Sequence, residues 1–179
     1  MPTEHSLKYL KCIPFILEAE GNDRITDHPS DPGGLTKWGV SKAAFPPELI
    51  TKILGYPKDI RELNRSEAII IWHTFWLKCG AENLPYPLAM IVFDCAVNCG
   101  VRTSTILLQR ALKVKEDGIF GPRTISASQS VPLKGLVCEY IRLRKRYYRA
   151  IIERNSNLRT FYEGWLNRLF NVTFEVMNL

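Results

Sequence analysis

The sequence predicts a mainly α-helical protein with one small β-ribbon near residues 35–40. Apolar residues recur at helical spacing along much of the chain, and no run alternates apolar and polar residues long enough to demand a strand. Of the 179 residues, 46% are apolar and 23% are charged. This balance is typical of a globular protein, because disorder requires fewer apolar residues and more net charge.

The first predicted helix covers residues 5–20, where apolar residues lie on one face. Pro14 either kinks this helix or begins it, because proline cannot donate the backbone hydrogen bond of a helix interior. Residues 21–35 hold three Asp, two Pro and three Gly residues. They therefore predict a long polar loop, and the β-ribbon near residues 35–40 follows it.

Local signals mark the ends of the later helices. Asn64 followed by Glu67 predicts a capping box that opens the helix running through Trp72 and Trp76. Pro85 begins the next helix and Gly100 ends it. The remaining elements are a helix over 102–112, a turn at 117–122 whose Pro122 opens a short helix, a helix over 133–153, and a last helix over 157–170.

The net charge of +6 suits an anionic partner such as nucleic acid, anionic lipid or an acidic wall polymer. No stretch reaches the roughly 18 apolar residues of a membrane helix, so we expect no stable membrane insertion. The N-terminus lacks the basic start and apolar core of a signal peptide. We therefore expect synthesis in the cytoplasm, and transport by another component if the substrate lies outside the membrane.

The chain has five cysteines, an odd number, so at least one of them is unpaired. Cys95 and Cys99 lie one helical turn apart, and neither has a histidine at the spacing of a metal site. We expect buried free thiols from a reducing compartment, and neither a metal nor a cofactor.

Glu20 is the candidate acid of a glycosidase. Glycoside hydrolysis needs an acid for the leaving oxygen and usually a second carboxylate. Glu20 ends an apolar helix at the mouth of the polar loop, where the helix dipole disfavours negative charge and suits a protonated acid. Asp23, Asp27 and Asp31 are candidates for the second carboxylate, and Thr36 for holding a water. These residue types are also common in surface turns.

Several motifs in a consistent order carry a family resemblance. Glu20-Gly21 followed by Asp31–Ser41 resembles the signature of glycoside hydrolase family 108. The second half resembles the peptidoglycan-binding segment that follows it in that family, at Phe93–Gly100, Leu108–Leu112, Asp117–Thr124 and Gly164–Arg168. The resemblance implies a lysozyme-like fold with a catalytic muramidase lobe at residues 1–92 and a peptidoglycan-binding helical lobe at 93–179, packed as one compact unit.

The resemblance also implies roles for single residues. Glu20 would be the catalytic acid, with Asp31 and Thr36 assisting the attack of water. The sequence departs from the family where Asn22-Asp23 follows Glu20-Gly21, and where the loop to Asp31 is somewhat longer. Asp27 therefore stays an alternative to Asp31.

A glycan groove needs aromatic faces and amide or hydroxyl partners. We expect the polymer to be bound by Trp38, Asp94, Asn98 and Tyr147, with Tyr148 as the alternative to Tyr147. Asn98 could instead cap its helix. The basic stretch 142–149 is either a solvated helix face with buried Leu143 and Tyr147, a contact for wall-peptide carboxylates, or a phosphate contact. Three tryptophans on amphipathic helices are expected in the core, namely Trp72, Trp76 and Trp165.

The leading hypothesis is an N-acetylmuramidase that cleaves the β-1,4 bond between N-acetylmuramic acid and N-acetylglucosamine in bacterial peptidoglycan. It would act in the periplasm or cell wall, for lysis or for release of a protein or toxin, with a holin or other export machinery as its route. The alternative is a non-catalytic peptidoglycan-binding module. A nucleic-acid-binding protein is a distant third, because only the charge supports it, and we expect no nucleic-acid partner.

Overall fold

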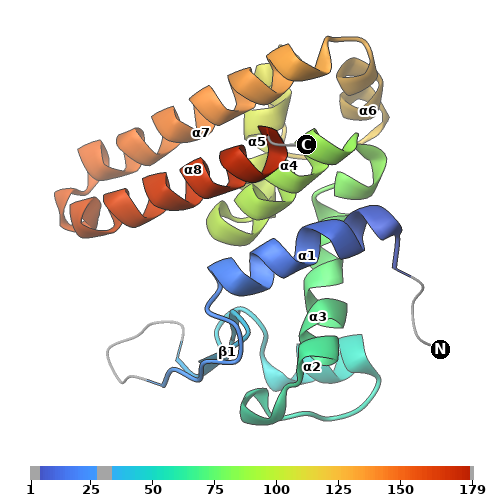
Figure 1. The fold of residues 1–179 in the computed structure, drawn as a ribbon, viewed down its shortest axis with the longest axis vertical. Helices are drawn as coiled ribbons and strands as arrows, with labels where there is room; N and C mark the ends of the chain where they lie inside the picture. Colours follow the sequence, from blue (N-terminus) through green and yellow to red (C-terminus); the bar gives the residue numbers. More distant parts are fainter. Residues whose placement is uncertain (1–4, 28–33, 178–179) are drawn as a thin grey trace. The chain divides into compact units, whose positions relative to one another are not determined.

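The structure, a computed structural model, describes residues 5–27 and 34–177. It divides into two compact units, Met1–Thr74 and Phe75–Leu179, each taken by itself below. The described residues form mainly helices, with a single two-stranded sheet among them (Figure 1). The units divide after Thr74, inside a helix, whereas the predicted lobes divide after residue 92.

The first unit begins with α1 (Leu7–Ala19), which Ser6 caps by accepting a hydrogen bond from the Tyr9 amide at 3.2 Å. Pro14 lies inside this helix. The alternative that the helix begins at Pro14 is therefore wrong. The buried face of α1 follows helical spacing, with Tyr9, Cys12, Ile13, Ile16 and Leu17.

The predicted ribbon is confirmed as a hairpin of β1 (Thr36–Lys37) and β2 (Val40–Ser41), paired antiparallel. Two elements that follow the hairpin were not predicted from the sequence, namely α2 (Pro47–Leu54) and the 3₁₀ helix η1 (Ile60–Glu62). Their signals are weak, because α2 has eight residues and buries only Ile50.

The capping box of α3 (Arg65–Lys78) is confirmed. The Asn64 amide donates to a Glu67 carboxylate oxygen at 2.8 Å, and the Glu67 amide donates to Asn64 Oδ1 at 3.0 Å. Glu67 is buried and also accepts from the Tyr56 hydroxyl at 2.9 Å and pairs with Lys58 at 3.3 Å. Burial alone would raise the pKa of Glu67, but these hydrogen bonds outweigh it and lower the pKa.

The second unit is built around α4 (Tyr86–Cys99), in which every residue from Leu88 to Ala96 is buried. After η2 (Ala81–Asn83), Pro85 precedes this helix and Gly100, at φ 88°, ends it, as predicted. Helix α5 (Val101–Ala111) follows at once, and α6 (Pro122–Gln129) begins at Pro122, also as predicted.

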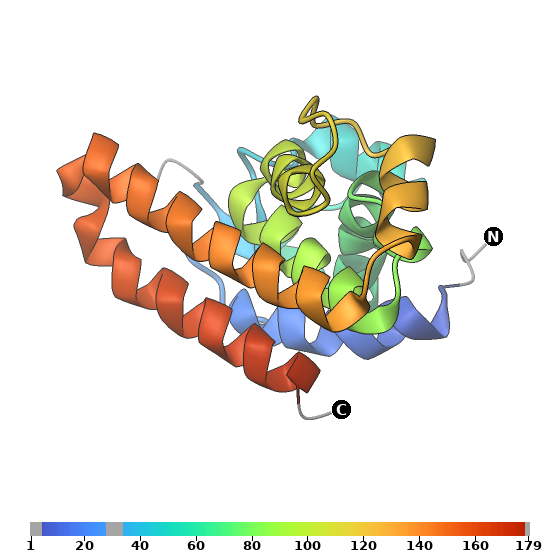
Figure 2. The same cartoon turned by 90° about the horizontal axis from the view of Figure 1, so that it is seen from above.

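Two long helices complete the second unit. Helix α7 (Leu133–Arg154) runs side by side with α8 (Tyr162–Met177), and both contact α4 (Figures 1 and 2). The predicted last helix at 157–170 is wrong at both ends. Its first residues form the 3₁₀ helix η3 (Ser156–Phe161), and α8 continues beyond residue 170 because Val172 and Val176 extend its buried face.

Two of the three tryptophans expected in the core are buried there. Trp72 is buried against Phe45 in the first unit, and Trp76 against Phe93 in the second. Trp165 is only half-buried, and its ring stacks on Tyr148 at 5.4 Å.

The expectation of buried thiols holds for three of the five cysteines. Cys12, Cys79 and Cys95 are buried, Cys99 is half-buried, and Cys138 is exposed. For Cys138 the expectation is wrong, because it lies on the solvent side of α7. Within residues 5–27 and 34–177, no helix combines the length and apolarity that crossing a membrane requires.

Candidate active site

Glu20 is the residue that terminates α1. The helix stops in a tight turn because Gly21 and Asn22 both take positive φ angles, 87° and 52°. In this turn the Gly21 amide donates to the Glu18 carbonyl at 3.0 Å, and the Asn22 amide donates to the Leu17 carbonyl at 2.8 Å. These bonds satisfy carbonyls that the helix end would otherwise leave without partners, and they present the half-buried Glu20 at the end of the helix.

The hairpin turn after β1 is the second part of the site. Its two central residues, Trp38 and Gly39, have φ angles of 56° and 73°, which is the pattern of a type I′ turn. This turn usually takes Asn, Asp or Gly at its first central position, so a tryptophan there is strained by about 1–3 kcal/mol. Such a conformation persists only where surrounding contacts hold it.

Three hydrogen bonds hold Trp38 in this conformation. Its amide donates to the Asn22 carbonyl at 3.0 Å, and its indole nitrogen donates to the Leu63 carbonyl at 3.1 Å. Its carbonyl accepts from the indole of the buried Trp72 at 2.9 Å. Trp38 therefore ties together the turn that ends α1, the segment before α3, and α3 itself.

Gly39 brings the hairpin into direct contact with Glu20. A Cβ atom at position 39 would lie 2.6 Å from Glu20 Cβ, 2.7 Å from its Cγ and 2.8 Å from its Oε2. Such distances are too short for any side chain, and the positive φ also favours glycine. Only glycine at this position leaves the carboxyl group of Glu20 its place beside the turn.

The other predicted residues of this site lie along the polar loop and β1. Thr36 donates its hydroxyl to the Gly34 carbonyl at 3.0 Å, and its backbone pairs with Thr26. Asp27 is exposed and forms an ion pair with Arg61 at 2.7 Å. Asp31 lies outside the described residues.

The predicted binding residue Asp94 is wholly buried in the second unit. Its two carboxylate oxygens accept hydrogen bonds from Arg144 at 2.6 Å and from Arg168 at 2.8 Å. Arg144 is also 0% exposed, and it donates to the Tyr148 hydroxyl at 2.7 Å. Burial alone would lower the pKa of Arg144, but the Asp94 carboxylate outweighs it and raises the pKa, so the guanidinium stays charged.

Asn98 and Tyr147 lie near this buried ion pair along the same helices. Asn98 is half-buried and accepts from the Tyr148 hydroxyl at 2.7 Å. Tyr147 is half-buried and lines a groove between α5 and α7 of about 480 Å³, which three arginines also line: Arg110, Arg146 and Arg154. The basic side chains of 142–149 are exposed apart from Arg144, and Leu143 is buried, so the interpretation as a solvated helix face is confirmed. It is wrong for Tyr147, because Tyr148 and Arg144 are the residues buried together with Leu143.

The buried, structural roles of Arg144 and Tyr148 were not predicted from the sequence. One signal was available, since Tyr140, Arg144 and Tyr148 recur at a spacing of four on one face of a predicted helix. An arginine on a face otherwise made of buried residues needs a buried carboxylate as its partner. The role of Gly39 had no such local signal, because its contact with Glu20 is tertiary.

Comparisons with known proteins match two consecutive segments of the chain, which divide near residue 100 and not after Thr74. Residues 13–100 match the family model described as glycosyl hydrolase 108, and residues 103–170 match the model described as predicted peptidoglycan domain. Among solved structures, the chain is similar to that titled "Structure of Brucella abortus SagA", with a TM-score of 0.77 and 24% identity. That likeness covers 95% of this chain and 94% of the other, and it confirms the predicted lysozyme-like, mainly helical fold. Among curated proteins, no match to the chain was found.

Proposed function

The chain belongs to the glycosyl hydrolase 108 family, and from that premise we propose that Glu20 is the acid that protonates the glycosidic oxygen of its substrate. The family consists of muramidases that hydrolyse peptidoglycan, and the chain is accordingly a lysozyme-like glycoside hydrolase. Its peptidoglycan domain makes peptidoglycan its binding partner. The bond cleaved is the β-1,4 linkage between N-acetylmuramic acid and N-acetylglucosamine.

The observation that carries the role of Glu20 is its contact with Gly39. An acid catalyst has to be held at a fixed position beside the bond that it protonates. Two separate elements restrict Glu20, because α1 ends at this residue and the hairpin turn packs against its side chain. Glu18 is two residues earlier and exposed, and it serves as a comparison for chemistry that needs a positioned carboxyl group.

Thr36 supports the attack of water in this proposal. Its hydroxyl proton is used in the bond to the Gly34 carbonyl, so the oxygen lone pairs are left to accept hydrogen bonds. A water that donates a hydrogen bond to this oxygen keeps its own lone pairs available to attack the sugar. Asp31 is the proposed carboxylate that activates this water or stabilises the positive charge of the transition state. Asp27 is the weaker alternative because its exposed carboxylate is already paired with Arg61 at 2.7 Å.

The groove at Tyr147 fits a length of acidic wall polymer. It combines an aromatic ring with the guanidinium groups of Arg146 and Arg154, whereas Arg110 is already paired with Glu116 at 2.6 Å. Aromatic faces suit sugar rings, and cations suit carboxylates. Asp94 supports binding indirectly, by holding Arg144 and Arg168 in place. Trp38 fixes the hairpin beside Glu20, and Asn98 contributes through its bond to Tyr148.

We also propose that the protein acts in the periplasm or cell wall, where peptidoglycan lies. A holin or other export machinery would provide its route from the cytoplasm. Cell lysis and the release of another protein or toxin through the wall both require the same cleavage, so both roles fit the proposed chemistry.

The test is digestion of purified sacculi by the wild type, Glu20→Gln and Glu18→Gln, with soluble products read by mass spectrometry. We expect the wild type and Glu18→Gln to release fragments with N-acetylmuramic acid at the reducing end. We expect Glu20→Gln to bind sacculi and to lose at least about 100-fold in rate, the lower range for a general acid. Full activity of Glu20→Gln would contradict the role of Glu20. Sedimentation with sacculi but no fragments from any of the three proteins would identify a binding module.

A further inference from the structure

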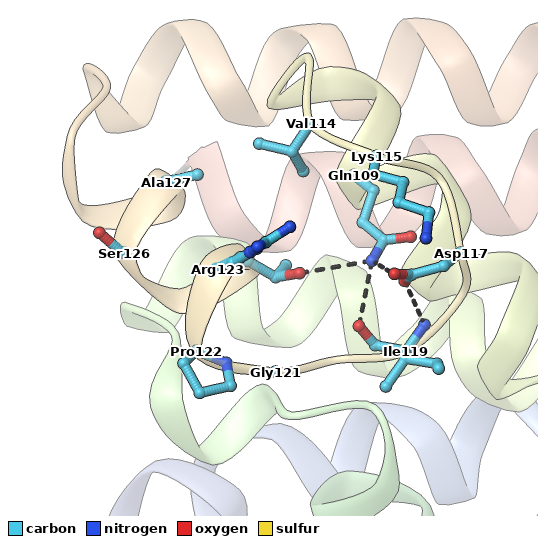
Figure 3. A pocket seen from close by; sticks show the side chains of 11 residues that line it. Gln109, Val114, Lys115, Asp117, Ile119, Gly121, Pro122, Arg123, Ser126 and Ala127 are labelled. Carbon is cyan, nitrogen blue, oxygen red and sulfur yellow. Dashed lines mark hydrogen bonds between the residues drawn. The ribbon is translucent and has the colours of Figure 1, made fainter.

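A second cavity lies within the residues that match the peptidoglycan domain. It has a volume of about 890 Å³ and is formed by the end of α5, the loop that follows it, and α6 (Figure 3). Ligand cavities in proteins commonly span about 300–1,000 Å³, so this one is large enough for a short peptide. No role in the proposed glycan cleavage uses it.

Gln109 holds the wall of this cavity in place. Its side chain is 2% exposed, and its amide oxygen accepts from the Gly118 amide at 2.8 Å. Its amide nitrogen donates to Asp117 Oδ1 at 2.8 Å and to the Ile119 carbonyl at 3.0 Å, as Figure 3 shows. Arg102 fixes the same loop from outside by donating to the Asp117 carbonyl at 2.9 Å. The loop is therefore pre-organised, which lowers the entropy cost of binding a ligand.

Three charged side chains line the cavity. Lys115 extends from the loop, Arg123 from α6, and Asp117 lies beside Lys115 in Figure 3. Hydrogen bonds from the Ile119 amide and from Gln109, with the charge of Lys115, lower the pKa of Asp117, so this carboxylate stays ionised at neutral pH. Because Asp117 balances Lys115, the excess positive charge of the lining is that of Arg123.

The apolar part of the lining is aliphatic, beside the polar side chains of Gln109, Thr124 and Ser126. Val114, Ile119, Pro122 and Ala127 supply small apolar surfaces, and no aromatic ring is found among the described residues that line the cavity. Sugar rings are generally bound against aromatic faces, as the Tyr147 groove offers. A cavity with aliphatic walls and an excess cation suits a ligand with methyl groups and a free carboxylate instead.

We propose that this cavity binds the peptide stem of peptidoglycan, with a free stem carboxylate at Arg123 and an alanine methyl group against the Val114 and Ala127 wall. This proposal rests on the proposed function, since it assumes that peptidoglycan is the polymer that the enzyme meets. It assigns the second unit a distinct task, recognition of the peptide, while the Glu20 site cuts the glycan.

The test measures binding of two probes to the full-length protein by calorimetry and by NMR chemical-shift changes. One probe is the free stem tetrapeptide L-Ala-γ-D-Glu-meso-diaminopimelate-D-Ala, and the other is a peptide-free oligomer of N-acetylglucosamine and N-acetylmuramic acid. We expect the stem to shift the amides of Val114 and Thr124, and the glycan oligomer to leave them unchanged. Arg123→Gln should weaken stem binding at least about tenfold, the effect of losing a charge-assisted hydrogen bond.

Arg159→Gln is the matched control, because Arg159 is an exposed arginine of η3 outside the cavity. Its stem affinity should equal that of the wild type, and circular dichroism should show that both variants are folded. A stem with amidated carboxylates should bind the wild type as weakly as the free stem binds Arg123→Gln. Stem binding that Arg123→Gln leaves intact, shifts confined to other residues, or no stem binding at millimolar concentration would each overturn the proposal.

The role of Glu20 and the assignment of the cavity are tested by different variants, so either can be wrong without the other. Glu20→Gln should keep the stem affinity of the wild type, and Arg123→Gln should keep the wild-type rate on glycan strands stripped of peptides. A Glu20→Gln protein that still cuts glycan and still binds the stem would overturn only the role of Glu20. An Arg123→Gln protein with unchanged stem affinity would overturn only the cavity assignment.

Discussion

The Glu20 side chain occupies the space that a side chain at Gly39 would need. An added Cβ would lie 2.6 Å from Glu20 Cβ and 2.8 Å from Oε2, closer than any van der Waals contact. The hairpin turn and the candidate acid therefore constrain one another, although Glu20 and Gly39 are 19 positions apart in the chain.

This relationship predicts that Gly39→Ala displaces Glu20 and lowers muramidase activity at least about 100-fold, since a shift of about 1 Å in a catalytic group has such an effect. The matched control is Gly55→Ala, because Gly55 also has a positive φ, 85°, but has no atom near the added Cβ. Both variants should lose about 1–2 kcal/mol of stability through the left-handed backbone, and Gly39→Ala should lose more because its Cβ also clashes with Glu20. Turnover of sacculi, measured beside urea unfolding, separates the two effects. Equal activity of the two variants would contradict the packing argument.

The strained conformation of Trp38 predicts coupling between two tryptophans. Trp38→Phe removes the donor to the Leu63 carbonyl, and Trp72→Phe removes the donor to the Trp38 carbonyl. Each change should cost about 1–3 kcal/mol, because a partly buried carbonyl is left without its partner. Urea unfolding of the two single variants and the double variant forms a cycle. Strictly additive losses would show that the two hydrogen bonds do not act together on the turn.

The burial of Asp94 predicts that this residue stabilises the fold and does not bind the polymer directly. Asp94→Asn removes the charge that balances the wholly buried Arg144, so we expect a loss of about 3–5 kcal/mol in the free energy of unfolding. Glu139→Gln breaks a solvent-exposed ion pair with Arg142 in the same unit and should cost less than about 1 kcal/mol. Chemical denaturation measures both variants. A stable Asp94→Asn protein with weakened binding to sacculi would instead assign Asp94 to the polymer.

The lowered pKa of Glu67 predicts a pH-dependent part of the stability. A carboxyl group whose pKa is lower in the folded than in the unfolded protein stabilises the fold above its ordinary value of 4.5. That contribution disappears as the pH falls through the lowered value. The stability difference between wild type and Glu67→Gln should therefore be larger at about pH 7 than at about pH 3. Thermal unfolding at both pH values measures it, and a difference that does not change with pH would exclude Glu67 as its source.

Local sequence signals predicted the helix ends well. The capping box at Asn64 and Glu67, the start of α6 at Pro122 and the end of α4 at Gly100 each depend on backbone groups within a few residues. Such signals act through the covalent neighbourhood, so they can be recognised without the fold. The end of α8 was missed because its last turns are held by the buried Val172 and Val176, a tertiary effect.

The candidate site divides in the same way. By itself, the sequence determined the helical class, the short ribbon, the family resemblance and the position of Glu20 at a helix end. These features depend on periodicity, capping and motif order, which can be recognised from residues that are neighbours in the chain. Only the tertiary structure decided that Gly39 packs on Glu20, that Trp38 is held by Leu63 and Trp72, and that Asp94 is enclosed by arginines 50 and 74 residues away. The reason is physical: the energy of a buried charge or a crowded glycine depends on which distant atoms surround it, and folding alone brings those atoms together.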